Sequence, residues 1–234
     1  TAPVQGLSIT SSTTLCPGTF EMKGYGSIYD EVAGGITIDS SDLTITCVNT
    51  KINGLLSSYG STTGTGLYAS EKNNITITGC SIDGFTTDLR FESSTNTTIN
   101  NSEINLTSVT GDDIIIENLT GRSLSLQYGS KGRMYESSFT TSGINIDSFD
   151  HLLIRNSTFS TMSGLEAIKI YYSNNISMYH NTFSDIDNNY IYTLTSYNIT
   201  LNTTVSGVAQ GNSWDEFCDN TSLSMDDDNS DGWY

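Results

Sequence analysis

The chain is poor in the residues that build helices, bind phosphate or cross a membrane. Its 234 residues include only 5 Ala and 9 Lys or Arg, so the best helix former and any basic patch for nucleic acid are scarce. No apolar run approaches the roughly 18 residues that a membrane-spanning helix needs. We therefore expect neither a helical fold, nor a nucleic-acid partner, nor a membrane span.

What the chain contains in excess is polar and acidic. Ser, Thr and Asn account for 88 residues, and 26 Asp or Glu bring the formal net charge to −17. Ile is the commonest of the large apolar residues, and β-branched residues favour strands. The chain begins with Thr1 and shows no apolar signal segment, so we read it as a processed, mature protein. The composition favours one elongated all-β domain.

Strand-like segments recur along the chain at intervals of 17 to 24 residues. Their first apolar positions are Leu67, Leu89, Leu106, Leu124, Ile144, Ile168 and Ile191. A second strand begins eight residues later, and a third points Ile82, Ile104, Phe139, Phe159 and Phe183 inward, with Gly121 and Ser206 interrupting that column. Inward residues alternate with outward ones within each strand, and the whole set of strands recurs about every 20 residues. This combination is typical of a solenoid.

The bends between the strands repeat as well. The residue before the second strand is Asn74, Asn96, Asp113, Lys131, His151, Asn175 or Asn198, and all but Lys131 tolerate a left-handed backbone. We expect Gly129 and Gly132 to absorb the strain beside Lys131. A second bend column reads Gly79, Asn101, Asn118, Glu136, Asn156, His180 and Thr203. Three strands per coil with tight bends predict a parallel β-helix of about nine coils.

The opening segments resemble a known family. Residues 14–20 (TLCPGTF), 35–38 (GITI) and 43–47 (LTITC), together with the coil at 143–159 and the ending Gly211–Trp214, are similar to archaeal right-handed β-helix surface proteins. That family shares its repeat with the copper-maturation factor NosD and with carbohydrate-binding and sugar-hydrolase β-helices. The resemblance implies a single-domain right-handed parallel β-helix. We divide it into an N-terminal cap and opening coil (1–34), β-helix coils (35–206) and an acidic C-terminal tail (207–234).

Four cysteines in a secreted chain indicate disulfide bonds. Cys16 and Cys47 occur together in the opening motif, so the family resemblance implies a bond between them. Cys80, in an inward column of small residues, is either a buried thiol or a competing partner. Cys218 lies near the far end of the rod, and an intermolecular bond would account for it.

Ten Asn-X-Ser/Thr sequons mark candidate N-glycosylation sites, a mild excess over chance. They are Asn74, Asn96, Asn100, Asn105, Asn118, Asn156, Asn175, Asn198, Asn202 and Asn220. Near the C-terminus, Asp227, Asn229 and Asp231 precede Gly232 in the pattern of half a calcium loop. Calcium is therefore the one cofactor that we expect, and the alternative is a solvated acidic tail.

Catalytic patterns are weak. Glu92 and Asp147 share an outward column but lie three coils apart, about 14 Å, wider than paired-carboxylate chemistry uses. Asp113 and the two histidines fall in bend columns, so a structural role in the turns is enough to account for these residues. We assign no catalytic residue and lean against an enzyme. We expect an extracellular, glycosylated structural or adhesive protein that assembles with itself into a filament or surface array. Five outward tyrosines are either contact residues of that assembly, sugar-stacking groups or ordinary surface aromatics: Tyr68, Tyr135, Tyr171, Tyr179 and Tyr192. The alternative is a carbohydrate-binding or carbohydrate-processing protein.

Overall fold

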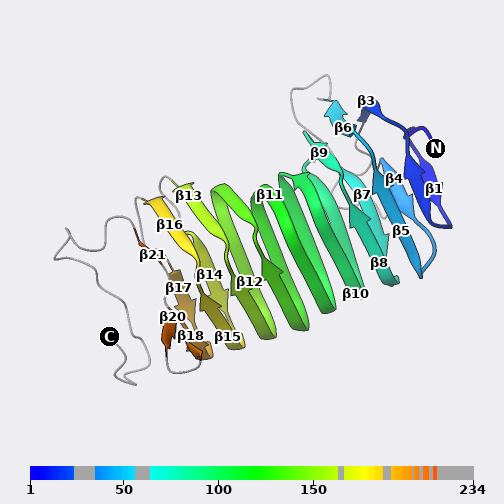
Figure 1. The fold of residues 1–234 in the computed structure, drawn as a ribbon. Helices are drawn as coiled ribbons and strands as arrows, with labels where there is room; N and C mark the ends of the chain where they lie inside the picture. The colour runs from blue at the N-terminus through cyan, green and yellow to red at the C-terminus, as the bar shows by residue number, and fades with distance from the viewer. Residues whose placement is uncertain are drawn as a thin grey trace.

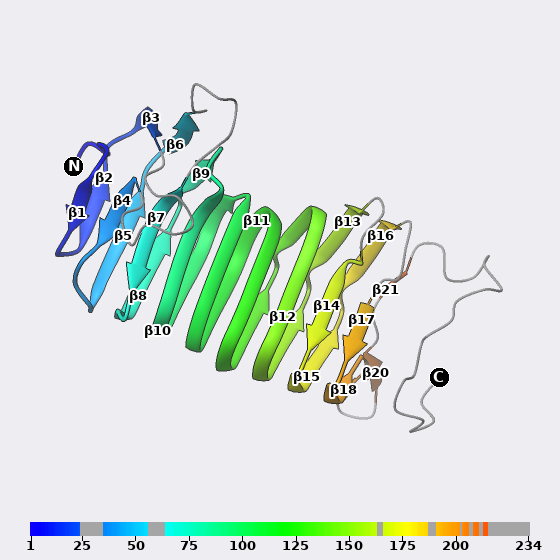
Figure 2. The same ribbon diagram turned by 180° about the vertical axis from the view of Figure 1, so that it is seen from behind.

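The computed structural model describes residues 1–23, 35–55, 64–162, 166–186, 191–201, 203–205, 208–210 and 213–214. Every regular element in these ranges is a β-strand, and they contain no helix that could cross a bilayer. Figures 1 and 2 show the strands stacked side by side along one long axis, with β1 at one end and β18 at the other. The predicted elongated all-β domain is confirmed.

Each coil contributes up to three strand segments. The first three coils consist of β1 (Leu7–Ile9), β2 (Thr13–Leu15), β3 (Gly18–Lys23), β4 (Ile36–Ile38), β5 (Leu43–Cys47), β6 (Thr50–Leu55), β7 (Thr65–Ser70), β8 (Asn73–Thr78) and β9 (Ser81–Asp83). The middle coils run together as β10 (Thr87–Ile104), β11 (Leu106–Tyr135) and β12 (Ser138–Arg155). The later strands are β13 (Thr158–Met162), β14 (Ile168–Tyr171), β15 (Asn174–Tyr179), β16 (Thr182–Ile186), β17 (Ile191–Leu194), β18 (Tyr197–Thr200), β19 (Thr203–Val205), β20 (Val208–Gln210) and β21 (Ser213–Trp214).

Successive coils pair in parallel and in register. The first inward column runs through Leu7, Ile36, Leu67, Leu89, Thr107, Leu124, Ile144, Ile168 and Ile191. Nine such positions confirm the predicted nine coils. Most of this column is buried, and it packs with the inward residues of the second and third strands in one continuous apolar core. Each coil thus completes the core of its neighbour, as a solenoid requires.

The predicted left-handed bends are present. All seven positions of the first bend column have a positive φ, between 52° and 58°. Lys131 itself adopts 58°, while neither Gly129 nor Gly132 takes a left-handed conformation, so the expectation that glycines absorb the strain is wrong. In the second column Thr203 differs, because it lies in the antiparallel hairpin of β19 and β20; the other six residues are left-handed.

Two inward columns differ from the expected alignment. The β10–β11 register shifts between Phe91 and Ser94, so Thr107 rather than Leu106 lies opposite Leu89. Thr107 is buried and its hydroxyl has no hydrogen-bond partner. At the far end, Trp214 pairs with Phe183, and the expected column residue Ser206 lies outside the described residues. A bulge and an inserted hairpin change the coil length locally. An alignment that assumes a constant spacing between columns therefore misplaces residues at both points.

A polar ladder runs inside the second bend. The backbone N–H of Cys80 donates to Ser102 Oγ at 3.2 Å, that of Leu119 to Ser137 Oγ at 3.2 Å, and that of Ser137 to Ser157 Oγ at 3.2 Å. Each serine hydroxyl donates in turn to the carbonyl oxygen two residues earlier, at 2.8 to 3.0 Å. The buried polar groups of the bend are therefore hydrogen-bonded, each to a group in the neighbouring coil or in its own coil.

Candidate functional site

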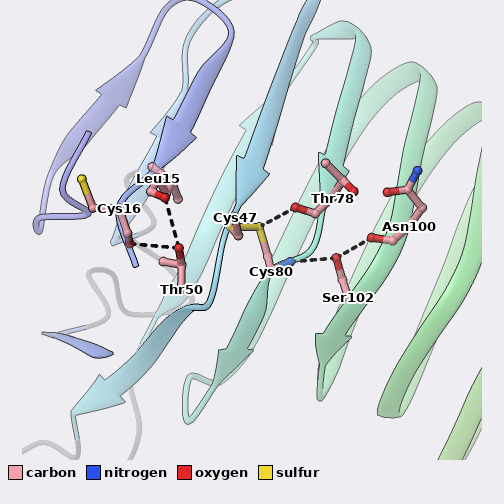
Figure 3. The surroundings of a disulfide bond; sticks show 8 residues. All are labelled: Leu15, Cys16, Cys47, Thr50, Thr78, Cys80, Asn100 and Ser102. Atoms are coloured by element: carbon pink, nitrogen blue, oxygen red, sulfur yellow. Dashed lines mark hydrogen bonds between the residues drawn. A yellow bond between two sulfur atoms is a disulfide. The ribbon is translucent and has the colours of Figure 1, made fainter. Parts of the chain in front are cut away.

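A disulfide bond joins the second and third coils. It links Cys47 to Cys80, with the two Cα atoms 4.8 Å apart, which corrects the expected bond between Cys16 and Cys47. Leu15, not Cys16, lies opposite Cys47 in the register of β2 and β5. Because neighbouring residues of a strand point to opposite faces, the Cys16 side chain points outward. Cys16 is an exposed free thiol, and Figure 3 shows its sulfur turned away from the bond.

The disulfide lies beside a hollow in the outer surface. Gly79 occupies the position that Asn101 and Asn118 fill in later coils, so one side chain is missing from the bend column. A Cβ atom at Gly79 would lie only 2.6 Å from the carbonyl oxygen of Cys47. The backbone of the disulfide-linked coils thus excludes a side chain at this point, and a groove results.

The groove has a volume of about 480 Å³ and crosses several coils. It is lined by Asn49, Thr50, Lys51, Gly79, Cys80, Ser81, Asn101, Ser102, Glu103, Asn118 and Thr120. Figure 3 shows Thr50, Cys80 and Ser102 on successive coils of this region. Thr50 and Ser102 are buried, and their hydroxyls bond within the fold. The exposed lining side chains still offer hydrogen-bond donors and acceptors to solvent; they are Asn49, Lys51, Asn101, Glu103, Asn118 and Thr120.

The side chains of the groove are held by their neighbours. Asn118 Nδ2 donates to Asn101 Oδ1 at 2.9 Å, and Ser81 Oγ donates to Glu103 Oε2 at 3.4 Å. The Thr50 hydroxyl donates to the carbonyl oxygen of Cys16 at 2.9 Å. Glu103 is the one carboxylate among the lining residues and Lys51 the one cation. The groove is thus preorganised for hydrogen bonding and carries no net charge.

An aromatic and cationic column begins one coil beyond the last groove residues, Asn118 and Thr120, on the strand that enters the second bend. Tyr135, Arg155 and Tyr179 pair in register on the outer face of β11, β12 and β15. The Arg155 guanidinium lies 4.3 Å from the centroid of the Tyr135 ring, a cation–π contact. The Tyr179 ring meets His180 edge-on, with centroids 5.5 Å apart. All three column residues are partly exposed.

A second polar cluster surrounds Glu92 on the first strand. Glu92 forms an ion pair with Arg90 and accepts a hydrogen bond from the Tyr68 hydroxyl at 2.5 Å. Burial, followed by the hydrogen bond to Glu92, raises the pKa of Tyr68. Asp147 occurs three coils further along this face, and Ser148 donates to it at 3.0 Å. The two acids form no pair, and Glu92 is already committed to its neighbours.

Asp88 is a buried carboxylate that sequence reasoning did not single out. It accepts the backbone N–H of Phe85 at 2.9 Å and that of Leu106 at 2.8 Å. Burial raises the pKa of Asp88 to about 6, although both hydrogen bonds act in the opposite direction. The side chain is 1% exposed. It fastens the bend after β9 to the next coil and has no route to a ligand, so its role is structural.

The predicted sequons fall into distinct positions. Asn74, Asn96, Asn175 and Asn198 lie in the first bend column, and Asn118 and Asn156 in the second. Their amides form ladders along the rod, as where Asn96 Nδ2 donates to Asn74 Oδ1 at 3.0 Å. Asn100 lies on β10 and Asn105 immediately after it. Asn202 and Asn220 lie outside the described residues, so glycosylation stays a prediction at all ten sites.

The calcium site near the C-terminus stays a prediction. Asp227, Asn229 and Asp231 lie outside the part of the chain that the structure describes. Within that part, no three His, Cys, Asp or Glu side chains cluster as a metal site would require. Both histidines lie at bends, as predicted, and His180 is exposed. His151 Nδ1 instead pairs with Asp150 Oδ2 at 2.8 Å.

Sequence reasoning named some residues of this surface and missed others. Tyr135 and Tyr179 were expected to face outward, but Arg155 between them was not singled out. Its place was readable, since all three residues follow the inward apolar residue of a second strand. More exposed tyrosines, Tyr128, Tyr172 and Tyr197 at 58–66%, lie at the first bend and were also missed. The groove was not foreseeable, because it depends on an absent side chain and on packing between coils.

Solved structures with a similar chain path are carbohydrate-related proteins. A candidate glycosyl hydrolase from Parabacteroides merdae is 11% identical, with 81% of this chain and 78% of its own covered and a TM-score of 0.38. The periplasmic alginate epimerase AlgG is 8% identical, with 82% of this chain and 60% of its own covered and a TM-score of 0.42. The A-module of the mannuronan C-5 epimerase AlgE4 from Azotobacter vinelandii is 12% identical (74% and 68% covered, TM-score 0.37). These likenesses concern the fold alone.

Comparison of sequences identifies the family of the chain. None of the curated proteins matches it. A family model described as a right handed beta helix region matches residues 24–203, well over half of the chain. The match agrees with the parallel register of nine coils described above. The chain therefore belongs to the right-handed β-helix family.

Proposed function

We propose that this protein is an extracellular carbohydrate-binding β-helix that holds a glycan in the polar groove beside the Cys47–Cys80 disulfide. The observation that carries the proposal is the groove itself. Its rigid wall of amides, hydroxyls and one charge of each sign matches the hydroxyl-rich surface of a sugar, which donates and accepts at many points. Preorganised groups of this kind bind without a large ordering cost.

The groove supports binding better than it supports hydrolysis. Glycosidases use two carboxylates about 5 to 10 Å apart across the scissile bond, and Glu103 is the one carboxylate among the residues that line this groove. Glu92, the acid of the other polar cluster, is held by Arg90 and Tyr68. We therefore favour retention of the glycan over its cleavage.

Affinity electrophoresis of the full chain against soluble polysaccharides tests this function. The panel includes galactomannan, xylan and mixed-linkage glucan as neutral polymers, and alginate and polygalacturonate as acidic ones. The substitution Ser81→Trp fills the groove from the outer face of β9 without touching the core. We expect it to weaken binding of every retained polymer by about tenfold or more, a loss of about 1.4 kcal/mol.

Thr182→Trp is the matched control. Thr182 lies in the same outward column of the third strand but on β16, several coils from the groove. It is expected to bind as the wild type does. If Ser81→Trp binds as tightly as the wild type, the groove is not the binding site. Failure of the wild-type chain to retain any polysaccharide would remove the function itself.

Self-assembly is a second candidate, favoured by one observation. Among the described residues, β1, β2 and β3 each pair with one strand only, and an unpaired strand edge invites another chain. However, the inward residues of this coil, Ile9, Leu15 and Met22, are already buried. End-on stacking would gain little apolar burial. Electron microscopy and sedimentation test it: filaments would support the subunit role, and monodisperse rods would oppose it.

Three further expectations belong to this proposal. An extracellular location accords with the disulfide, because such bonds persist in oxidising compartments, and with the resemblance to archaeal surface proteins. Glycans at the exposed bend asparagines would accord with the same location. Calcium at the C-terminal acidic segment is tested by calorimetry at millimolar calcium, where heat of binding is expected and its absence would remove the site.

A further inference from the structure

The polar groove leads into a second surface of different chemistry. Asn101 and Asn118 line the groove, and each directly follows a residue of one outward column, Asn100 and Glu117. The same position relative to the bend is occupied by Tyr135, Arg155 and Tyr179 in three consecutive later coils. This tyrosine–arginine column therefore lies on the strand that enters the second bend, in the coils that follow Asn118, while the groove lies at this bend and on the strand that leaves it. We call the two surfaces together the track, with hydrogen-bonding groups first along the rod and stacking groups after.

Arg155 has capacity that the fold does not use. Within the part of the chain that the structure describes, its guanidinium lies 4.3 Å from the centroid of the Tyr135 ring. No acidic residue of the described ranges pairs with it, although the protein carries a net charge of −17. Its Nε atom is buried without a hydrogen-bond partner. Arg155 is partly exposed. Because its Nε is shielded from solvent, only the terminal guanidinium nitrogens can donate hydrogen bonds to a ligand that lies along the column.

The charges along the track are balanced. The cations Lys51, Arg133 and Arg155 lie on or beside it, and an equal number of acids does so as well: Glu103, Glu117 and Glu136. No positive field would draw an acidic polymer to a chain that is itself strongly negative. Tyrosine rings, by contrast, offer apolar faces with a polar tip, which suit the apolar faces of sugar rings whatever their charge. A neutral chain of sugars fits both halves of the track.

We propose that the tyrosine–arginine column is a second subsite and that the ligand is a neutral, extended polysaccharide spanning the groove and the column together. This inference rests on the proposed carbohydrate binding and adds the class and length of the ligand. Tyr135 and Tyr179 stack on sugar rings, and Arg155 between them donates to hydroxyl oxygens. The groove alone holds a short oligosaccharide, so affinity increases once the chain is long enough to reach Tyr179.

Calorimetry with fragments of graded length tests the column. The probes are disaccharide and octasaccharide fractions of whichever neutral polymer in the panel is retained. The wild type is expected to bind the octasaccharide about tenfold or more tightly than the disaccharide. Arg155→Gln and Tyr179→Ala are each expected to lose about fivefold to tenfold for the octasaccharide, the usual worth of one such contact, and nothing for the disaccharide.

Tyr192→Ala is the matched control, because Tyr192 is a partly exposed tyrosine on the outer face of β17, away from the track. It should bind both probes as the wild type does. If Arg155→Gln and Tyr179→Ala bind the octasaccharide normally while Ser81→Trp does not, the column is refuted and the groove function stands. Retention of alginate or polygalacturonate alone would refute the neutral ligand. Absence of all binding would refute both proposals.

Discussion

Removing the Cys47–Cys80 bond should destabilise the N-terminal coils by about 4 kcal/mol. The bond closes a segment of 33 residues, and the chain-entropy relation gives about 3.7 kcal/mol for a loop of this length. Both sulfurs belong to buried residues, at 6% and 1% exposure, so Cys47→Ala/Cys80→Ala also loses some packing. Reducing the wild-type chain separates the two effects, because it breaks the bond and keeps both side chains.

The loss should be local as well as large. Each coil of a solenoid contacts its neighbours only, so amides of β4 to β9 should lose hydrogen-exchange protection while those of β14 to β18 keep theirs. Urea unfolding with and without reductant gives the free energy, and exchange mass spectrometry gives the location. Cys16→Ala is the control, since an exposed side chain away from the bond should change stability by about 0.5 kcal/mol or less.

Several outcomes would refute this reasoning. A loss below about 1 kcal/mol in the double variant would show that the cross-link does not restrict the unfolded chain as the entropy relation requires. Equal sensitivity of the double variant to reductant would assign the effect to another bond. A peptide map that recovers Cys16 joined to Cys47 would contradict the register of β2 and β5 itself.

Three other substitutions test the interior and the bends. Burial raises the pKa of Asp88 from 3.8 to about 6, so the folded state holds this proton to higher pH than the unfolded state does. The free energy of unfolding should therefore fall by about 3 kcal/mol in all as pH rises from about 3 to 7. Urea unfolding of Asp88→Asn should lack that component. Phe159→Ala removes a ring whose centroid lies 6.0 Å from that of Phe139 and 4.9 Å from that of Phe183. Thermal and urea unfolding should show that the free energy of unfolding falls by about 5 kcal/mol. A fall of less than about 2 kcal/mol would contradict the close packing of this column. Lys131→Gly relieves a left-handed backbone at φ 58° and should raise the free energy of unfolding by about 1 kcal/mol; a decrease would mean that the Lys131 side chain stabilises the bend.

The fold was predictable because its determinants are local and repeated. An inward residue every second position and an Asn or Asp before the second strand recur in coil after coil, so an error in one coil is corrected by the others. The prediction went wrong where coil length changed. The bulge after Phe91 replaced Leu106 by Thr107 in the core, and nothing in a list of spacings marks a bulge.

The candidate site was less predictable because it is defined between coils. The disulfide depends on which face of a strand each cysteine occupies, and the family motif drew attention to Cys16, which faces outward. The groove depends on Gly79, where a missing side chain matters only beside Asn49 and Asn101. By contrast, the alignment of Tyr135, Arg155 and Tyr179 follows from the same period that revealed the fold.

The serine ladder inside the second bend makes whole coils the natural unit of insertion or deletion. Each coil accepts hydrogen bonds from the coil before it and donates to the coil after it through the same positions. Removing half a coil would leave both partners unpaired, whereas duplicating residues 138–157 would present the same donor and acceptor to each neighbour. The length of the rod can therefore change in whole steps of about 4.8 Å, and a longer rod would offer a proportionally longer track to its ligand.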